Sequence, residues 1–373
     1  MPDSNRPELH SGSRYAQRMV QFTVLASGSK GNCTVVSGGR TRILVDAGLS
    51  CRELFRRMKV AGEDPQALDA IVITHEHQDH VSGLSVTARK LGIPVYFTEP
   101  THRAWMRWLT PRRQMTYAQW LEQCRKQAAE RQAEAGETDC LEDGSDTEDG
   151  VTESDLDSTI ATLPPGRPRP AVQTLDLSAD GSGRDGSPAV AANEKEKLKS
   201  AKDDPTWLPG VEYFEAGRPF AIGDIEISPF TISHDAADPV GFVFRAEGVR
   251  MGFATDLGYI TPNVKRQLKG VDLLLLESNH DLEMLRDGPY PWSVKQRVLS
   301  RVGHLSNEAA AEFLEKEYDG QAAYVILAHL SESNNLPELA RVTAERALNG
   351  RASLLANRLL LATQGTSLTS IVL

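Results

Sequence analysis

The chain has 373 residues, of which 40% are hydrophobic, enough to bury one large core or two modest ones. Its longest apolar run, at 271–276, is far shorter than the roughly 20 residues of a membrane-spanning helix, and residues 1–18 lack the apolar stretch of a signal peptide. We therefore expect a globular protein without membrane contact. Four cysteines without a CxxC pair predict a reducing, cytoplasmic location and argue against a cysteine zinc site.

The formal net charge of −10 is concentrated in one segment. Ten acidic residues and no Lys or Arg lie between Glu137 and Asp157, and removing them from the 51 acidic residues leaves 41, equal to the number of basic residues. A net charge of −10 alone would argue against a nucleic-acid partner, but a neutral remainder removes that objection. The acidic segment is instead a place where protein partners could bind.

Alternating strand and helix patterns begin at residue 19 and indicate an α/β protein. Strands are expected at 20–25, 33–36, 42–45, 69–73 and 95–97, and helices at 51–60 and 81–91. Residues 103–210 read as an insertion, helical over 103–135 with an amphipathic helix at 117–135. Residues 136–205 are acidic and rich in Ser, Pro and Gly, so we predict disorder there and in the 1–18 tail. The catalytic domain is then 19–102 together with 211–373.

The second half of the chain repeats the alternation. Strands are expected at 211–214, 220–222, 225–232, 240–246, 250–254, 271–276 and 322–327, and a helix at 307–318. Residues of the types that bind metals recur where strands end, at Asp46, His234, Asp256, Glu277 and His329. Since α/β proteins place their sites at the carboxyl ends of strands, we expect these side chains to meet. Asp46 would suit a carboxylate that orients a ligating histidine.

Residues 74–80 read Thr-His-Glu-His-Gln-Asp-His directly after an expected strand. The three imidazoles and one carboxylate exceed the three protein ligands of a tetrahedral catalytic zinc with an open position. The surplus indicates two ions, with His75 and His77 facing one, and Asp79 and His80 facing the other. The alternative is a polar surface turn, which is rare for a cluster of this kind in a chain with nine histidines.

In chain order, this motif, His234, Asp256 and His329 resemble the successive motifs of the metallo-β-lactamase superfamily. The resemblance implies a four-layer αββα sandwich, in which two sheets pack face to face with helices outside. It also implies two divalent metal ions, Zn or Mn by donor chemistry. By this likeness the first ion binds to His75, His77 and His234, the second binds to Asp79, His80 and His329, and Asp256 bridges both. The oxygen-reducing branch has Glu where this chain has His77, which favours hydrolysis.

The segment after His304 resembles the corresponding motif of the ribonuclease Z branch. That likeness implies that His304 is the general acid or a phosphate-binding group and that Glu277 orients it. The alternative is a helix-capping histidine beside a buried carboxylate. Asp79 is expected to act in catalysis as well, by orienting the attacking hydroxide.

Longer strings resemble the YycJ/WalJ group of cytoplasmic bacterial proteins, at 27–32, 234–239, 277–281, 303–307 and 329–335. This resemblance implies a 5′-to-3′ DNA exonuclease in which a hydroxide shared by two ions attacks a phosphodiester. Lys30, Asn32, His280 and Asn335 are the expected substrate-binding residues. For Lys30 and Asn32 an ordinary hairpin turn is the alternative, and His280 could simply pack.

Two other functions remain open at this point. One is an acyl hydrolase of a small thioester, lactone or lactam, and the other is a metal-binding signalling protein that acts through the insertion. A nuclease predicts that Lys30, Asn32, His280, His304 and Asn335 converge on the metal pair, whereas an acyl substrate needs an apolar pocket. The sequence does not indicate an oligomeric state.

Overall fold

The computed structural model describes residues 19–110, 126, 204–349 and 358–373. The chain divides into two compact units, one made of Met1–Pro111 and Leu198–Leu373 and the other of Arg112–Lys197. The predicted tail, the predicted helix at 117–135 apart from Lys126, and the acidic segment up to residue 203 lie outside the described residues. The account below therefore concerns the first unit, and the division into catalytic domain and insertion stays a prediction.

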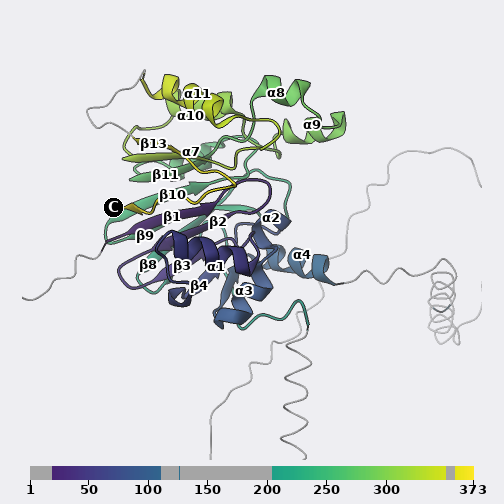
Figure 1. The fold of residues 1–373 in the computed structure, drawn as a ribbon, viewed down its shortest axis with the longest axis vertical. Coiled ribbons are helices and arrows are strands. Elements are labelled where there is room, and N and C mark those ends of the chain that lie inside the picture. The colour runs from purple at the N-terminus through teal and green to yellow at the C-terminus, as the bar shows by residue number, and fades with distance from the viewer. Residues whose placement is uncertain (1–18, 111–125, 127–203, 350–357) are drawn as a thin grey trace, which may run out of the picture. The chain divides into compact units, whose positions relative to one another are not determined.

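Two seven-stranded sheets form the centre of this unit (Figure 1). The first sheet has, in spatial order, β14 (Ile371–Val372), β1 (Gln21–Ala26), β2 (Cys33–Ser37), β3 (Arg42–Val45), β4 (Ala70–Val72), β5 (Val95–Phe97) and β6 (Val211–Tyr213). The second has β13 (Arg358–Leu361), β12 (Tyr324–Ala328), β11 (Leu273–Glu277), β10 (Val249–Ala254), β9 (Val240–Ala246), β8 (Ile225–Thr231) and β7 (Phe220–Ile222).

The two sheets share one pairing pattern. In the first, the strands from β14 to β3 pair antiparallel and those from β3 to β6 pair parallel. In the second, the strands from β7 to β10 pair antiparallel and those from β10 to β13 pair parallel. Each sheet therefore has a parallel half whose carboxyl ends can supply site residues.

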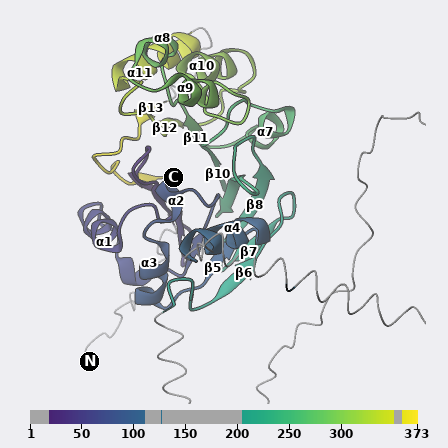
Figure 2. The same ribbon diagram turned by 90° about the vertical axis from the view of Figure 1, so that its right-hand side faces the viewer.

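Helices cover the outer faces of both sheets (Figure 2). The first sheet is covered by α1 (Cys51–Val60), α3 (Leu84–Leu91) and α4 (Glu99–Leu109), and the second by α7 (Pro262–Gln267), α10 (Asn307–Lys316) and α11 (Pro337–Asn349). Short helices also lie in connections: the 3-10 helix η1 (Pro65–Ala67) and the α-helices α2 (Gln78–Val81), α8 (Leu282–Asp287) and α9 (Trp292–Val298). Side-chain caps fix several helix starts, for example Ser50 before α1 and Ser306 before α10. Across the described ranges, no helix combines the length and apolar character of a bilayer span.

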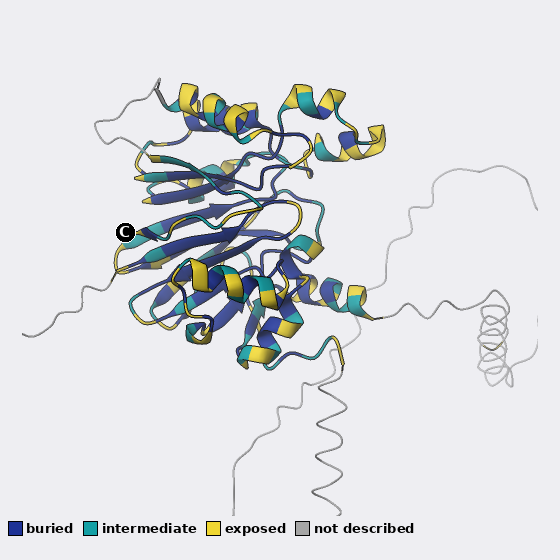
Figure 3. Cartoon of the chain, viewed as in Figure 1, coloured by how far each residue is buried: buried dark blue, intermediate teal, exposed yellow. Residues whose placement is uncertain are grey.

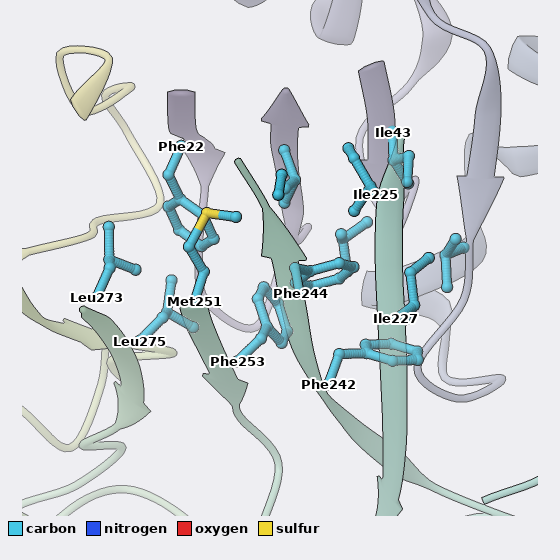
Figure 4. Close-up of a cluster of buried hydrophobic side chains, with 14 of the residues drawn as sticks. Phe22, Ile43, Ile225, Ile227, Phe242, Phe244, Met251, Phe253, Leu273 and Leu275 are labelled. Carbon is cyan, nitrogen blue, oxygen red and sulfur yellow. The ribbon is translucent and has the colours of Figure 1, made fainter. Parts of the chain in front are cut away.

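Buried apolar side chains form three clusters, one in each space between layers (Figure 3). Between the sheets, Phe22 and Ile43 face Phe242, Phe244 and Met251 (Figure 4). Truncating a fully buried phenylalanine of this kind to Ala typically costs about 3–5 kcal/mol of stability. Two sheets packed face to face with helices outside confirm the predicted αββα sandwich.

The structure differs from the expected elements in several places. The helix expected at 81–91 is broken into α2 and α3 at Gly83, where a Cβ would lie 1.9 Å from the carbonyl oxygen of Leu49. The predicted domain boundary at His102 falls inside α4, whose Trp105 is buried against the first sheet. The elements α7, α8, α9, α11, β13 and β14 were not predicted.

Candidate metal centre

The predicted ligands follow the carboxyl ends of strands in both sheets. The motif at 74–80 comes after β4, and its last two ligands, Asp79 and His80, lie in α2. Asp256 follows β10 closely, and His329 directly follows β12. Their donor atoms meet in two groups, so strand ends from both sheets build one site.

Three residues of this site adopt a left-handed backbone conformation. Asp46, Asp256 and His329 have φ angles of 60°, 59° and 57°. Such a conformation costs a non-glycine residue roughly 1–3 kcal/mol and persists only where the surrounding structure imposes it. All three lie just beyond a strand, where the chain turns sharply. Asp46 and Asp256 contact His80, and His329 contacts Asp79. The strain is therefore concentrated at the site.

The first ligand group contains His75, His77 and His234, whose donor atoms lie within 4.8 Å of one another. His234 donates from Nδ1 to the carbonyl oxygen of Gly303 at 3.1 Å, which leaves its Nε2 facing Nδ1 of His77 at 3.2 Å. Burial lowers the pKa of His75 well below 6.5, so this imidazole is neutral. Its Nε2 is buried and has no hydrogen-bond partner within the described part of the chain. A buried nitrogen lone pair without a partner is what a metal ion would complete.

The second group contains Asp79, His80, Asp256 and His329. Nε2 of His80 lies 3.4 Å from Oδ2 of Asp79 and also 3.4 Å from Oδ2 of Asp256. Burial opposes protonation of His80, but the carboxylates of Asp256 and Asp79 outweigh it and raise the pKa of His80 well above 6.5. Burial also opposes the charge of Asp256, yet His329 and His80 hold its pKa well below 3.8. The pKa of His329 is raised in the same way, so protonated His80 and His329 balance the negative charge of the carboxylates. A divalent cation can take over this role.

Both groups fit metal ions by donor type, because each gathers imidazole nitrogens in a buried site and the second adds carboxylates. The structure brings together all seven predicted ligands. Asp256 belongs to the second group and not to the first, so its bridging role stays a prediction. A further group of Asp256, Glu277, His304 and His329 overlaps the second.

Four of these histidines are held through Nδ1, which directs Nε2 toward the centre. The partners are Oδ2 of Asp46 for His80 at 2.7 Å, Oε1 of Glu277 for His329 at 2.9 Å, the carbonyl of Gly303 for His234 at 3.1 Å and Oγ1 of Thr74 for His75 at 3.0 Å. Partners of this kind orient ligating imidazoles and raise their basicity. Asp46 therefore lies where the sequence places an orienting carboxylate.

Asn32, predicted to bind substrate, contacts a predicted metal ligand. Its side chain is buried, and Nδ2 donates to Oδ2 of Asp79 at 3.1 Å. Its backbone N–H donates to the carbonyl oxygen of Asp79 at 2.7 Å. This approach depends on Gly48, where a Cβ would lie only 1.7 Å from the same carbonyl oxygen. The position favours a role in orienting Asp79 over direct contact with substrate.

His304 and Glu277 form a hydrogen-bonded pair. Nδ1 of His304 lies 2.8 Å from Oε1 of Glu277, and the imidazole reaches the cavity. Oε2 of Glu277 accepts hydrogen bonds from the backbone N–H groups of Leu257 and Leu305, at 2.7 Å and 3.2 Å. Burial opposes the charge of Glu277, but His304 and His329 lower its pKa to about 2, so it is a carboxylate at neutral pH. The pair has the geometry expected of a positioned acid.

The other three predicted substrate residues lie elsewhere, and within the described residues none of them lines the cavity. Lys30 is exposed and pairs with Glu332, with Nζ 2.6 Å from Oε2. Asn335 is buried and donates to the carbonyl oxygens of Ser278 and Asn279 at 2.9 Å and 3.0 Å. His280 is also buried, and burial lowers its pKa to about 4. Substrate binding by these residues stays a prediction that their placement does not favour.

A cavity of about 380 Å³ opens over the predicted metal ligands, lined by His77, Asp79, Asp256, His304 and His329 among others. Its wall includes Trp108, Asp235 and Arg297, which the sequence analysis did not single out. Asp235 directly follows the predicted ligand His234 in the sequence and could have been predicted from that position. No sequence pattern indicated Trp108 or Arg297 as site residues. A larger cavity of about 620 Å³ at β6 and β7 contains none of the clustered histidines, so chemistry and not volume identifies the site.

Comparisons with known proteins agree with this geometry. A metallo-beta-lactamase superfamily model matches residues 26–172, and a beta-lactamase superfamily domain model matches residues 174–330. The chain is 30% identical over 329 residues to the exodeoxyribonuclease YycJ of Bacillus anthracis, covering 88% of this chain and 89% of the relative. It is 29% identical over 323 residues to the exodeoxyribonuclease WalJ of Streptococcus pneumoniae serotype 2, covering 87% and 86%. The metallo-beta-lactamase fold protein YhfI from Bacillus subtilis shares the fold, with a TM-score of 0.52 at 12% identity over 94% of this chain and 99% of YhfI.

Proposed function

The chain belongs to the metallo-beta-lactamase superfamily, as a metal-dependent hydrolase of the YycJ/WalJ-like group, and we propose that it hydrolyses phosphodiester bonds in DNA. The specific activity proposed is 5′-to-3′ exonuclease action with two metal ions. The named activity of both relatives supports DNA as the substrate. The structural observation that carries the proposal is the His304–Glu277 pair beside the second ligand group, in which His304 lines the cavity and Glu277 is buried behind it.

In this proposal the two ligand groups each hold one divalent ion, Zn or Mn. His75, His77 and His234 would hold the first ion, and Asp79, His80 and His329 would hold the second. Asp256, which lies in the second group, would be shared by both ions. When bound, such ions lower the pKa of water and neutralise the negative charge of a phosphodiester. The remaining chemistry is assigned to side chains of the chain itself.

Three side chains would handle the substrate and its protons. Asp79, held by Asn32 through Oδ2, accepts a hydrogen bond from the attacking water and aligns it. His304 donates the proton on Nε2 to the leaving oxygen, because its Nδ1 is hydrogen-bonded to Glu277. Arg297 places a guanidinium in the wall of the same cavity, where it can attract a phosphate, although its Nε is bonded to Asp235.

A small-molecule acyl hydrolase is the second candidate, and two observations favour it. Five residues are expected to converge for a phosphodiester substrate. Of these, only Asn32 and His304 are linked to the ligand groups, Asn32 by its bond to Asp79 and His304 through Glu277, which also bonds to His329. The cavity wall also includes the apolar side chains of Val294 and Val298. A signalling function through the acidic insertion would depend on residues outside the described ranges.

The test is cleavage of 5′-labelled and 3′-labelled DNA, single-stranded and duplex, with Mn²⁺ or Zn²⁺. We expect nucleotides to be released from the 5′ end by the wild type, and most of this activity to be lost in Asp79→Asn and His304→Ala. Arg245→Ala is the matched control, because Arg245 is an exposed residue of β9 outside the cavity. Hydrolysis of thioesters or lactones without cleavage of DNA would establish the second candidate. Equal cleavage by all proteins would place the activity at another site.

A further inference from the structure

An exposed tryptophan lies in the wall of the cavity that contains the metal ligands. Trp108, in the last turn of α4, is 66% exposed and lines the same cavity as Asp79, His304 and His329. A large aromatic side chain is normally buried, where it contributes substantially to stability. Here the side chain instead presents much of its surface to the space above the ligands.

The fold of α4 does not require Trp108. Trp105, three residues earlier, is 2% exposed, and its ring lies 5.9 Å from that of Phe97 and 5.8 Å from that of His102. Trp105 therefore already anchors the helix on the first sheet. The exposed ring of Trp108 is available for a ligand.

The wall also includes side chains from α9, in the other half of the chain. Val294 and Val298 add apolar surface, and Arg297 adds a positive charge. The cavity thus combines metal ligands at one place with an aromatic and apolar wall at another. A nucleotide has the matching parts, since its phosphate is an anion and its base is a flat ring with two apolar faces.

We infer that Trp108 is a stacking surface for the base next to the scissile phosphate, and that the enzyme takes DNA with an unpaired end. This inference rests on the proposed function, because it assumes a nucleic-acid substrate. Bases stack on aromatic side chains irrespective of sequence, as a nuclease without base specificity needs. Trp108 acts as a positioning residue for the substrate and takes no part in proton transfer.

The size of the cavity supports the requirement for an unpaired end. Its volume of about 380 Å³ is near the lower end of the range for ligand sites, roughly 300–1,000 Å³. A single nucleotide fits a cavity of that size, whereas a base pair brings a second nucleotide and a second backbone. A base that has stacked neighbours on both faces must leave its own helical stack to reach Trp108, which costs a few kcal/mol in a duplex and least in a single strand.

The test compares two oligonucleotides that differ only in their bases. One is a 5′-phosphorylated single-stranded oligothymidylate, and the other carries abasic tetrahydrofuran residues in place of its first two nucleotides. Both KM for cleavage and Kd by fluorescence anisotropy without divalent metal are measured for the wild type, Trp108→Ala and Trp108→Phe. Trp292→Ala is the matched control, because Trp292 is 65% exposed on α9 and does not line the cavity.

We expect Trp108→Ala to raise KM and Kd for the oligothymidylate about 5- to 150-fold, the range typical of one lost stacking contact. The same variant should change the values for the abasic oligonucleotide less than about twofold. Trp108→Phe should keep most of the affinity, and Trp292→Ala should behave as the wild type. The wild type should also prefer a 5′ overhang to a blunt duplex.

Equal losses on both oligonucleotides, or no loss on either, would overturn the stacking role. Equal cleavage of blunt and overhanging ends would overturn the requirement for an unpaired end. The proposed function is judged separately, because cleavage that does not depend on Trp108 would support it while refuting this inference. If the wild type cleaves neither oligonucleotide but binds the base-bearing one more tightly through Trp108, the stacking role stands and the exonuclease proposal fails.

Discussion

Oε1 of Glu277 lies 2.8 Å from Nδ1 of His304, at the carboxyl end of β11. The same oxygen lies 2.9 Å from Nδ1 of His329, which is a predicted metal ligand. One buried carboxylate therefore orients both the proposed acid and a ligand of the second ion. Substitution of His304 should affect catalysis alone, whereas substitution of Glu277 should also affect metal binding and stability. This difference tests the assigned roles.

His304→Ala should lower kcat about 10²- to 10⁴-fold, the usual contribution of a positioned acid, and leave metal content unchanged. Elemental analysis of the purified variant, together with kcat on labelled DNA, checks both parts. Arg245→Ala again serves as the control. Loss of one equivalent of metal from His304→Ala would instead identify His304 as a ligand, as the overlapping group with Asp256, Glu277 and His329 permits.

Glu277→Gln should affect activity, metal binding and stability together. The carboxylate of Glu277 accepts hydrogen bonds through both oxygens, whereas glutamine has one acceptor oxygen and one NH₂ donor. The substitution therefore disturbs either the contacts to His304 and His329 or those to the N–H groups of Leu257 and Leu305. Leaving one such buried group without its partner costs about 1–3 kcal/mol. Urea unfolding of the metal-free protein measures that loss. A variant with wild-type stability and metal content but low kcat would show that Glu277 acts through His304 alone.

The two ligand groups predict two equivalents of metal in the wild-type protein and about one in each of two variants. His77→Ala removes a donor from the first group, and Asp79→Asn removes a charged donor from the second. Elemental analysis after dialysis against Mn²⁺ or Zn²⁺ gives the stoichiometry. A wild-type protein with a single equivalent would contradict the dinuclear proposal.

Asp46→Asn should weaken metal binding by about 10- to 100-fold, as is typical when the partner of a ligating histidine is changed. Asparagine can still accept from the N–H of Thr74, which now bonds to Oδ1 of Asp46 at 2.9 Å, but it removes the charge 2.7 Å from Nδ1 of His80. Metal titration calorimetry measures the change. Unaltered affinity would show that the orientation of His80 does not depend on this carboxylate.

The parts of this molecule that could be predicted from sequence are those with a local signal. The alternation of apolar strands and helices gave the α/β class, and the closely spaced donors from His75 to His80 gave the metal site. His234, Asp256 and His329 are scattered along the chain, and only the resemblance to a known family assigned them. Their donor atoms meet because the strands before them end at the same place in the fold.

The remaining differences come from contacts between residues that are distant in sequence. Asn32 looked like a phosphate-binding turn residue, yet it bonds to Asp79, 47 positions away. Lys30 forms an ion pair with Glu332, and a local sequence pattern does not show such a distant partner. Trp108 follows a helical pattern like that of the buried Trp105, so periodicity cannot tell the exposed ring from the buried one.

The pH dependence of metal binding follows from His80 and His329. Burial opposes their protonation, but in the metal-free protein the neighbouring carboxylates, Asp256 first among them, raise the pKa of both well above 6.5. A raised pKa adds stability that is fully present below about pH 6.5, the value of an unfolded histidine, and is lost as pH rises through the folded-state pKa. Metal-free protein should therefore lose this contribution at alkaline pH.

A metal ion can bind these two imidazoles only after their protons leave, so binding should release protons and tighten as pH rises. We expect affinity to increase up to about tenfold per pH unit for each proton displaced. The gain in Tm on adding Mn²⁺ should accordingly widen from about pH 6 to about pH 8. Calorimetric titration in two buffers of different ionisation enthalpy counts the protons directly. Affinity that stays constant across this range, with no proton release, would mean that both histidines are already neutral in the metal-free protein.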